Sequence, residues 1–307
     1  MEIPFTLRQL QYFQAAASSG SLSSAADLMG VTPTALSLAL EEFEKRLGLS
    51  LLIRRKGRGI ILTSDGHRIL EKSKHLLSDA VQLMDEASDS RREVSGVLRV
   101  GVFTTLAPFF SPPILKDFAA KYPGIDVRVV EGSAQMLHDQ LISGQLDLAV
   151  QYGFQVSENL FFTPLFEFRP YLLVPAEHRV AALREVSLKQ VADDPVIGLN
   201  IQPTLQNTRH IYEQVGISPT IIHNTSSFEV ARCLVGNDLG VTVLFQRAAT
   251  TSTYDGTSVV ALRLTDSIRP STLGVVQAMS ATETERVRVM VDFVDDLLNT
   301  SEIFQPL

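Results

Sequence analysis

The chain has 307 residues with 45% hydrophobic content, which is enough for ordinary buried cores in two or more domains. Its one cysteine, Cys233, excludes an internal disulfide, and no stretch approaches about 18 uninterrupted apolar residues. We therefore expect no membrane span, no signal peptide and a cytoplasmic location. The net charge is −7, but residues 1–68 hold eight basic and six acidic residues, so the negative charge lies in the remainder and does not exclude a nucleic acid partner.

Two short helices joined by a tight turn are predicted near the N-terminus. Ser21 is a suitable N-cap for a helix that runs to Met29, and Gly30 ends it in the left-handed conformation. Thr32 then caps a second helix, with Pro33 in the first turn, where its missing N–H costs nothing. This outline is that of a helix-turn-helix, whose second helix enters the major groove of DNA.

The second helix is amphipathic, and the two faces have different compositions. One face is apolar and is expected to be buried: Leu36, Leu40, Phe43 and Leu47. The opposite face is expected to meet the DNA: Thr34, Ser37, Leu38, Glu41 and Lys45. A preceding helix is predicted to supply the third wall of this small core through one apolar face: Leu7, Leu10, Phe13 and Ala17.

A cationic wing is predicted after the second helix, which Gly48 ends. Leu52–Arg55 and Ile60–Thr63 are typical of two short strands around a loop. Four of the five residues from 54 to 58 are basic, which suits contact with phosphates: Arg54, Arg55, Lys56 and Arg58. Such a cluster is often only a solvated surface, but its place beside a helix-turn-helix favours DNA contact.

Residues Leu7 to Leu70 resemble the N-terminal domain of LysR-type transcriptional regulators. The resemblance rests on LRQLQYF, GSLSSAA, ALS, EKRLG and LTSDG in this order. It implies that the DNA-contacting set includes, besides the wing, the residues Ser23, Thr32, Pro33, Thr34, Ser37, Leu38 and Glu41.

The outward face departs from the family pattern, in which a Gln-Pro pair and an Arg are common at the positions of Pro33, Thr34 and Leu38. Leu38 cannot donate a hydrogen bond but can pack on a thymine methyl group, and Glu41 can accept from a cytosine amino group. We therefore expect an unusual operator preference.

A long helix is predicted from Thr63 to about Arg92, where no proline interrupts the chain. Two rows of apolar residues recur in it every seven positions: Ile69, Leu76 and Leu83, and Leu70, Leu77 and Met84. This spacing favours a coiled-coil seam that needs a partner helix, although a core helix of the next domain is an alternative. In the family, the corresponding linker helix pairs with that of another subunit, and members are usually tetramers built as dimers of dimers.

The remaining chain alternates between strands and helices. Apolar runs of strand length are expected at Val97–Phe103, Ile125–Glu131 and Leu146–Gln151, separated by helices at Ile114–Tyr122 and Met136–Ser143. This alternation predicts a parallel sheet. Further strands are expected from Pro170, Pro195, Thr220, Gly240 and Leu273, and a final helix follows.

The predicted fold class is α/β, with an N-terminal winged helix-turn-helix and a long linker helix. Residues Val97 to Leu298 resemble LysR effector domains, which imply two Rossmann-like sub-domains similar to type 2 periplasmic binding proteins. The expected domains are residues 1–63, 64–95 and 96–307, the last divided into sub-domain I (about 96–167 and 270–307) and sub-domain II (about 168–269).

A small-molecule effector is expected in the cleft between these sub-domains, beyond the carboxyl ends of the strands. Candidate residues follow the predicted strands: Thr104, Thr105, Leu106, Ser133, Asn200, Gln202, Thr204, Ser226 and Phe228. Each Ser or Thr is also a plausible helix cap, but their convergence from four loops favours a ligand site, and the resemblance places Thr104, Thr105 and Ser133 at effector positions.

The chemistry of these groups suits a small carboxylate or other polar metabolite. Its apolar or aromatic part is expected against Phe103, Phe228 or Phe245, and Arg169 or Arg232 is a candidate cation.

Motifs for catalysis are absent from the sequence. There is no Gly-x-Ser-x-Gly, no phosphate-binding Gly-x-x-x-x-Gly-Lys and no His-Glu-x-x-His, and the six histidines are scattered. We therefore expect no enzyme, no cofactor and no metal. The expected partners are double-stranded DNA, the effector, further copies of the chain and RNA polymerase. A binding protein with a vestigial DNA-binding domain and an enzyme that uses the cleft remain as alternatives.

Overall fold

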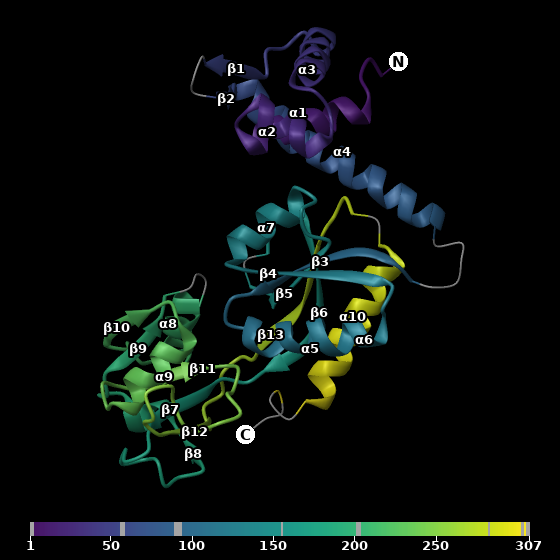
Figure 1. Cartoon of the computed structure of the whole chain (residues 1–307). Coiled ribbons are helices and arrows are strands. Elements are labelled where there is room, and N and C mark those ends of the chain that lie inside the picture. Colours follow the sequence, from purple (N-terminus) through teal and green to yellow (C-terminus); the bar gives the residue numbers. More distant parts are fainter. Residues whose placement is uncertain are drawn as a thin grey trace. The chain divides into compact units, whose positions relative to one another are not determined.

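The computed structural model describes residues 3–55, 59–88, 94–154, 156–200, 204–281, 283–301 and 304. The chain divides into two compact units (Figure 1). The first consists of Met1–Glu93 and the short segment Ser143–Gln145, and the second is built from Val94–Ile142 and Leu146–Leu307.

The first unit is a winged helix-turn-helix followed by a long helix. Its elements are α1 (Leu7–Ser19), α2 (Leu22–Met29), α3 (Pro33–Leu47), β1 (Leu52–Arg55), β2 (Gly59–Leu62) and α4 (Ser64–Ser88). The predicted capping is confirmed: Ser21 and Thr32 accept bonds from the backbone N–H groups of Ser24 and Ala35. The predicted ends are confirmed as well, since Gly30 and Gly48 are left-handed.

The core of the first unit contains the predicted apolar face of α3. The buried apolar residues are Leu10, Phe13, Ala16, Ala25, Ala26, Leu36, Leu40, Phe43, Leu51 and Leu52. The prediction for α1 was partly wrong, because Leu7 is 47% exposed and Ala16 rather than Ala17 is fully buried. Leu7 belongs to the first turn of α1, and this turn lies at the border of the core.

The wing is attached to the helices through its backbone. Strands β1 and β2 pair antiparallel, with Leu52 opposite Leu62. The N–H of Ile60 donates to the carbonyl of Gly20, the residue that ends α1, at 2.7 Å. Gly59 has φ +80°, and a Cβ placed on it would lie 2.3 Å from Gly20 O. This close approach requires glycine at position 59.

Helix α4 ends at Ser88, and residues 89–93 of the predicted helix lie outside the described residues. The prediction that both apolar rows need a partner helix was wrong for the residues that already pack against the unit's own core: Ile69, Leu70 and Leu77. The other residues of these rows are exposed, namely Leu76, Leu83 and Met84, the last two at 69% and 71%. One part of the two apolar rows therefore packs inside the first unit, and the other part is exposed on the surface of α4.

The second unit contains a sheet with the strand order β4-β3-β5-β13-β6. The strands are β3 (Gly96–Phe103), β4 (Ile125–Gly132), β5 (Leu148–Tyr152), β6 (Leu160–Phe168) and β13 (Ser271–Ala278). Strand β3 is parallel to β4 and β5, as predicted, but β13 is antiparallel to both of its neighbours. The sheet is therefore mixed rather than parallel, because β13 enters it from the other half of the unit and runs in the opposite direction.

Helices cover both faces of this sheet, with α7 (Ala134–Ile142) on one side and α5 (Ala107–Pro113), α6 (Ala119–Lys121) and α10 (Glu285–Thr300) on the other (Figure 1). The helix predicted from Ile114 begins earlier, at Ala107. It continues through a π-helical segment, η1 (Ile114–Phe118), immediately after Pro112 and Pro113, which lack the N–H that a regular helix needs.

The other half of this unit carries a second sheet with the order β11-β7-β12-β8 and a parallel pair formed by β9 and β10. Its elements are β7 (Tyr171–Pro175), β8 (Glu185–Val186), η2 (Leu188–Val191), β9 (Val196–Leu199), α8 (Thr204–Gln214), β10 (Ile221–Thr225), α9 (Phe228–Gly236), β11 (Thr242–Leu244) and β12 (Val259–Leu264). Strands β6, β8 and β12 and helix α8 were not predicted. The two halves are the two sub-domains of this unit.

Candidate nucleic-acid interface and effector pocket

The outward face of α3 carries side chains that lie outside the hydrophobic core. Thr34 and Glu41 are exposed, Leu38 is 61% exposed and Ser37 is half-buried. The hydroxyl of Ser37 donates to Oε1 of Glu41 at 3.1 Å, one helical turn further on. The predicted arrangement of the two faces of α3 is therefore confirmed in its geometry.

The two other acidic residues of α3 support the fold. Glu42 pairs with Arg46 at 2.8 Å, and this hydrogen bond holds the pKa of the Glu42 carboxyl below its ordinary value. Glu44 accepts hydrogen bonds from the backbone N–H groups of Leu51 and Leu52 and so ties α3 to β1. Glu41 accepts from the hydroxyl of Ser37 and lies on the outward face.

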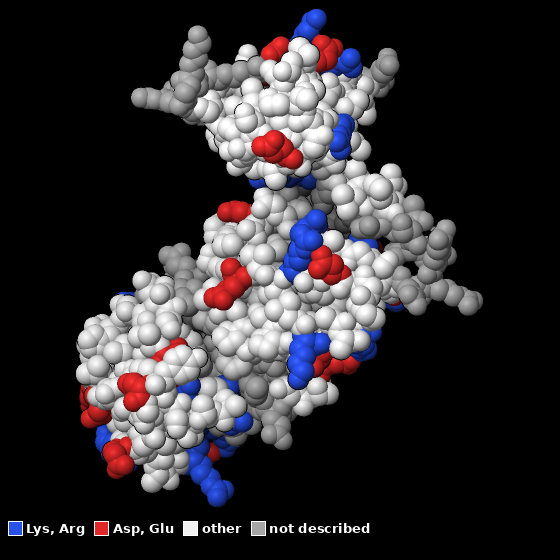
Figure 2. All heavy atoms as spheres, viewed as in Figure 1, with Lys and Arg blue, Asp and Glu red and all other residues white. Residues whose placement is uncertain are grey.

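The rest of the predicted DNA-contacting set is spread over α2, the start of α3 and the wing. Ser23 and Pro33 are exposed, while the Thr32 side chain serves as the N-cap of α3. Arg54 and Arg55 belong to β1, but their side chains lie outside the described part of the structure, as do Lys56 and Arg58 entirely. On the face shown in Figure 2, basic and acidic groups are small and interspersed, and wide areas carry neither.

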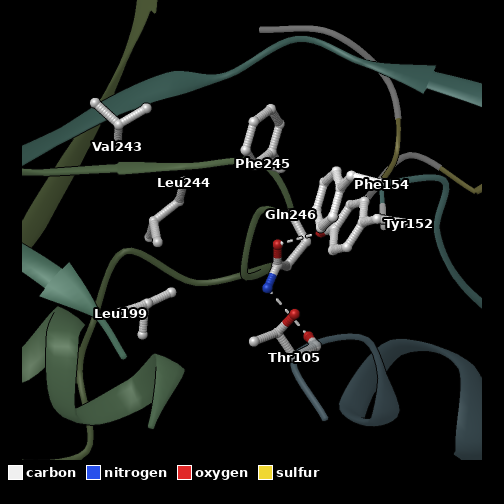
Figure 3. A pocket seen from close by; sticks show the side chains of 8 residues that line it. All are labelled: Thr105, Tyr152, Phe154, Leu199, Val243, Leu244, Phe245 and Gln246. Atoms are coloured by element: carbon white, nitrogen blue, oxygen red, sulfur yellow. Dashed lines mark hydrogen bonds between the residues drawn. The ribbon is translucent and has the colours of Figure 1, made fainter. Parts of the chain in front are cut away.

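A pocket lies between the two sub-domains of the second unit (Figure 3). The hollow measures about 290 Å³ only when the open solvent at its mouth is included, and the space open to the centre of a water-sized sphere is about 10 Å³. The lining residues come from the ends of β3 and β5 in one sub-domain and of β9 and β11 in the other: Thr105, Tyr152, Phe154, Leu199, Val243, Leu244, Phe245 and Gln246. Apolar and aromatic walls with a few polar groups are typical of small-ligand sites.

A buried hydrogen-bond network centred on Gln246 joins the sub-domains at this pocket (Figure 3). Tyr152 OH donates to Gln246 Oε1 at 2.8 Å, and Gln246 Nε2 donates to the carbonyl of Thr105 at 3.1 Å. On the other side, Tyr171 OH donates to the carbonyl of Gln246 at 2.9 Å. Burial raises the pKa of both phenols well above the ordinary value, so they remain neutral donors.

The structure places the predicted effector residues after β3 in three different settings. Thr105 is buried and lines the pocket. Thr104 is half-buried, and its N–H donates to Gly132 O at 3.0 Å. Leu106 is fully buried in the hydrophobic core, so the assignment of its side chain to the ligand site was wrong.

The candidates in the other loops do not line the pocket. Ser133 and Ser226 are exposed, and Ser133 accepts weakly from Met136 N at 3.4 Å. Asn200 is exposed. Phe228, at the start of α9, packs edge-on against Phe109 of α5 with 6.1 Å between ring centroids, which brings these two helix starts together. Gln202 and the side chain of Thr204 lie outside the described residues.

Most of the pocket residues were missed by sequence reasoning, which had named only Thr105 and Phe245 among them. Tyr152 and Leu199 are the last residues of buried strands, and this position was the available signal.

The candidate cation Arg232 is buried and engaged in the fold: it pairs with Glu229 at 2.7 Å and donates to two backbone carbonyls. Arg169 is exposed.

Within the described ranges, no group of three or more His, Cys, Asp and Glu residues is arranged to hold a metal ion. His138 is buried beside Gln151, with 2.9 Å between its Nε2 and the amide nitrogen, and burial lowers the pKa of the imidazole. In the same described ranges, no helix combines the length and apolar character that a membrane crossing requires.

Comparisons with known proteins agree with this architecture. Residues 7–67 match the family model of the bacterial regulatory helix-turn-helix protein, LysR family, and residues 91–299 match that of the LysR substrate binding domain. The transcriptional regulator TtuA of Agrobacterium vitis is 28% identical over 242 residues, which cover 78% of this chain and 79% of TtuA.

Solved structures give the same result. A putative LysR family regulator from Pseudomonas aeruginosa, the PA01 protein, is 30% identical with a TM-score of 0.66, covering 96% of this chain and all of its own. Full-length CbnR in complex with its target DNA has a TM-score of 0.66 at 18% identity, covering 97% of this chain and 100% of CbnR, and shows the fold alone.

Proposed function

The chain belongs to the LysR family of DNA-binding transcriptional regulators, and from this premise we propose that α3 and the wing bind a specific operator while the pocket binds a small metabolite that controls this binding. The matched families and relatives are regulators and not enzymes. The observation that carries the proposal is one chain with an exposed α3 face and a separate pocket bridged by Gln246.

The proposed DNA contacts divide into two kinds. Thr34, Ser37, Leu38 and Glu41 of α3 are available to base edges, whereas the cations predicted in the wing supply affinity through phosphates. The solved complex of CbnR with its target DNA supports a DNA-binding role for this fold.

We infer that the effector is a small carboxylate or other polar metabolite with an apolar or aromatic part. The aromatic walls, Phe154 and Phe245, suit that part, and the polar groups of Tyr152, Gln246 and Thr105 suit a hydrogen-bonding group. Because Gln246 already satisfies Tyr152 and Thr105, a ligand that reaches these groups must rearrange a contact between sub-domains. A ligand that binds one sub-domain arrangement more tightly shifts the population toward it.

We propose a tetramer, built as a dimer of dimers, in which α4 supplies one contact. Its exposed apolar side chains support this contact, because Leu76, Leu83 and Met84 gain from being covered by a second helix. The family assignment also supports a cytoplasmic location and RNA polymerase as a further partner.

Two measurements test the proposal. DNA binding by the full-length chain at two salt concentrations is expected to weaken steeply at the higher one, because phosphate contacts release counterions. Retention of ligand binding with no DNA binding at low salt would instead favour a binding protein with a vestigial DNA-binding domain.

The second measurement is a thermal-shift screen of carboxylates and neutral aromatic compounds, followed by operator footprinting with every compound that binds. A change in the protected region is expected. An unchanged footprint with all bound compounds would contradict control of DNA binding by the effector.

A further inference from the structure

The side chain of Gln246 fills the polar part of the pocket, and the chemistry around it indicates which ligand group can replace it. Its carboxamide lies between Tyr152 OH and the carbonyl of Thr105 (Figure 3). With this side chain in place, about 10 Å³ of the hollow is open to the centre of a water-sized sphere, which is room for about one water molecule. A ligand with an apolar or aromatic body is larger than this, so it has to displace the carboxamide to reach Tyr152 and Thr105.

The two partners of the carboxamide determine which atoms can take its place. The Thr105 carbonyl can only accept, so the carboxamide nitrogen faces it and donates at 3.1 Å. The carboxamide oxygen then faces Tyr152, whose hydroxyl donates to it at 2.8 Å. A group that satisfies both partners therefore offers one donor and one acceptor side by side.

The phenol of Tyr152 is held in place as a neutral donor. Burial raises its pKa well above the ordinary value, although a hydrogen bond with the Thr105 side chain opposes this rise. The ring is stacked with Phe154, at 5.1 Å between centroids, and contacts Phe245 at 6.0 Å. The hydroxyl therefore needs a new acceptor when the carboxamide leaves, because a buried donor without a partner is costly.

Charged side chains are missing from the described lining of the pocket. The buried Arg232 is already engaged with Glu229 and two backbone carbonyls, and Arg247, which follows Gln246 in the chain, is not one of the lining residues. A carboxylate offers acceptors alone, so one of its oxygens would face the carbonyl of Thr105 with no donor between them. Burial of such an ion without a paired cation is costly, and this favours a neutral group.

We propose that the effector carries a neutral amide, either a primary carboxamide or a lactam, that takes the place of the Gln246 side chain. The amide N–H donates to the Thr105 carbonyl, and the amide oxygen accepts from Tyr152 OH. The apolar or aromatic body of the ligand lies against the pocket walls, which include Leu199 and Phe245. This inference rests on the proposed effector-binding function, and of its two ligand classes it selects the uncharged polar metabolite over the carboxylate.

The test compares three probes of similar shape by calorimetry with the full-length wild type: benzamide, acetophenone and benzoate. Benzamide offers a donor and an acceptor, whereas acetophenone and benzoate offer acceptors alone. Benzamide is expected to bind at least about ten-fold more tightly than either, because the other two leave the Thr105 carbonyl without a donor.

Two variants and a control test whether benzamide binds at this position. Tyr152→Phe removes the donor and is expected to weaken benzamide binding by about ten-fold. Gln246→Ala removes the competing carboxamide and is expected to strengthen it by about five-fold or more. Tyr212→Phe is the matched control, since Tyr212 is fully buried in α8 and does not line the pocket, and it is expected to leave benzamide binding unchanged. The melting temperature of each variant without probe reports whether its fold is intact, and the wild-type comparison depends on none of them.

The outcomes separate the ligand class from the function on which it rests. Acetophenone or benzoate binding as tightly as benzamide overturns the neutral amide but leaves a small-ligand pocket in place. Benzamide binding that Tyr152→Phe does not weaken overturns the assignment to Tyr152 and Thr105. If the wild type binds none of the three probes, the amide is also overturned, and the metabolite screen with operator footprinting decides separately whether the pocket takes an effector.

Discussion

The two candidate sites differ in the burial of their side chains: those on α3 are largely exposed, whereas those of the pocket are buried. On α3, Thr34, Leu38 and Glu41 lie on the surface while Leu36, Leu40 and Phe43 are buried in the core, so the proposed recognition face and the stabilising face of this helix are separate. In the pocket, Tyr152 and Gln246 are both buried and bonded to each other across two sub-domains. Recognition of DNA is therefore free to change without loss of the fold, whereas recognition of a ligand is coupled to stability.

The largest effect is expected from a pair of leucines that differ only in the face they occupy. Leu40→Ala removes a fully buried side chain, and a loss of about 2–5 kcal/mol in the free energy of unfolding is expected, with loss of DNA binding. Leu38→Ala, the matched control, is expected to change this free energy by less than about 0.5 kcal/mol. Denaturant unfolding of both variants measures the difference, and similar losses would contradict the separation of faces.

A smaller but measurable loss is expected in the pocket. Gln246→Leu removes the partner of Tyr152 OH and of the Thr105 carbonyl in a buried setting, at a cost of about 1–3 kcal/mol. Adding Tyr152→Phe is expected to cost less in this variant than in the wild type, because the hydroxyl has already lost its partner. Thermal unfolding of the full double-mutant cycle measures the coupling. Additive effects would mean that the two side chains act independently.

The wing offers a test of affinity without specificity. Arg54→Ala is expected to weaken binding to all DNA sequences about equally and to reduce the salt slope by about 1, since one phosphate contact is lost. Binding to selected and unrelated duplexes across a salt series measures both quantities. A loss confined to the selected sequence would move Arg54 from the backbone-contacting group to the base-reading group.

The smallest expected effect concerns the buried His138. Burial lowers the pKa of its imidazole in the folded state. At pH values below about 6.5, the ordinary pKa of histidine, the unfolded state therefore binds a proton more readily than the folded state does. Stability is therefore expected to fall as the pH drops through about 6.5, and His138→Gln is expected to show less of this decline. Melting temperatures from about pH 8 to about pH 5 measure the difference between the two proteins. Parallel curves would contradict the assignment.

The helix-turn-helix was predictable because its determinants are local. Ser21, Gly30, Thr32 and Gly48 each act within a few residues, and the buried stripe of α3 lies in one segment. The pocket depends on Gln246, which meets Tyr152 and Thr105 from far along the chain, and no local pattern reports such a meeting.

Two further misses have the same origin. Pro164 in the middle of β6 argues against a strand, yet β6 is tolerated at the edge of the sheet. The antiparallel direction of β13 depends on the path of the chain between sub-domains, which its own residues do not encode.

The carboxylate of Glu44 makes α3 and the wing a single mechanical piece. By accepting from the backbone N–H groups of Leu51 and Leu52, it links α3 to the wing, the two elements that we propose meet the groove and the adjacent phosphates. We therefore expect these two elements to dock on DNA as one body. In the proposed tetramer, adaptation to operators with different half-site spacing is then expected from the contacts between subunits.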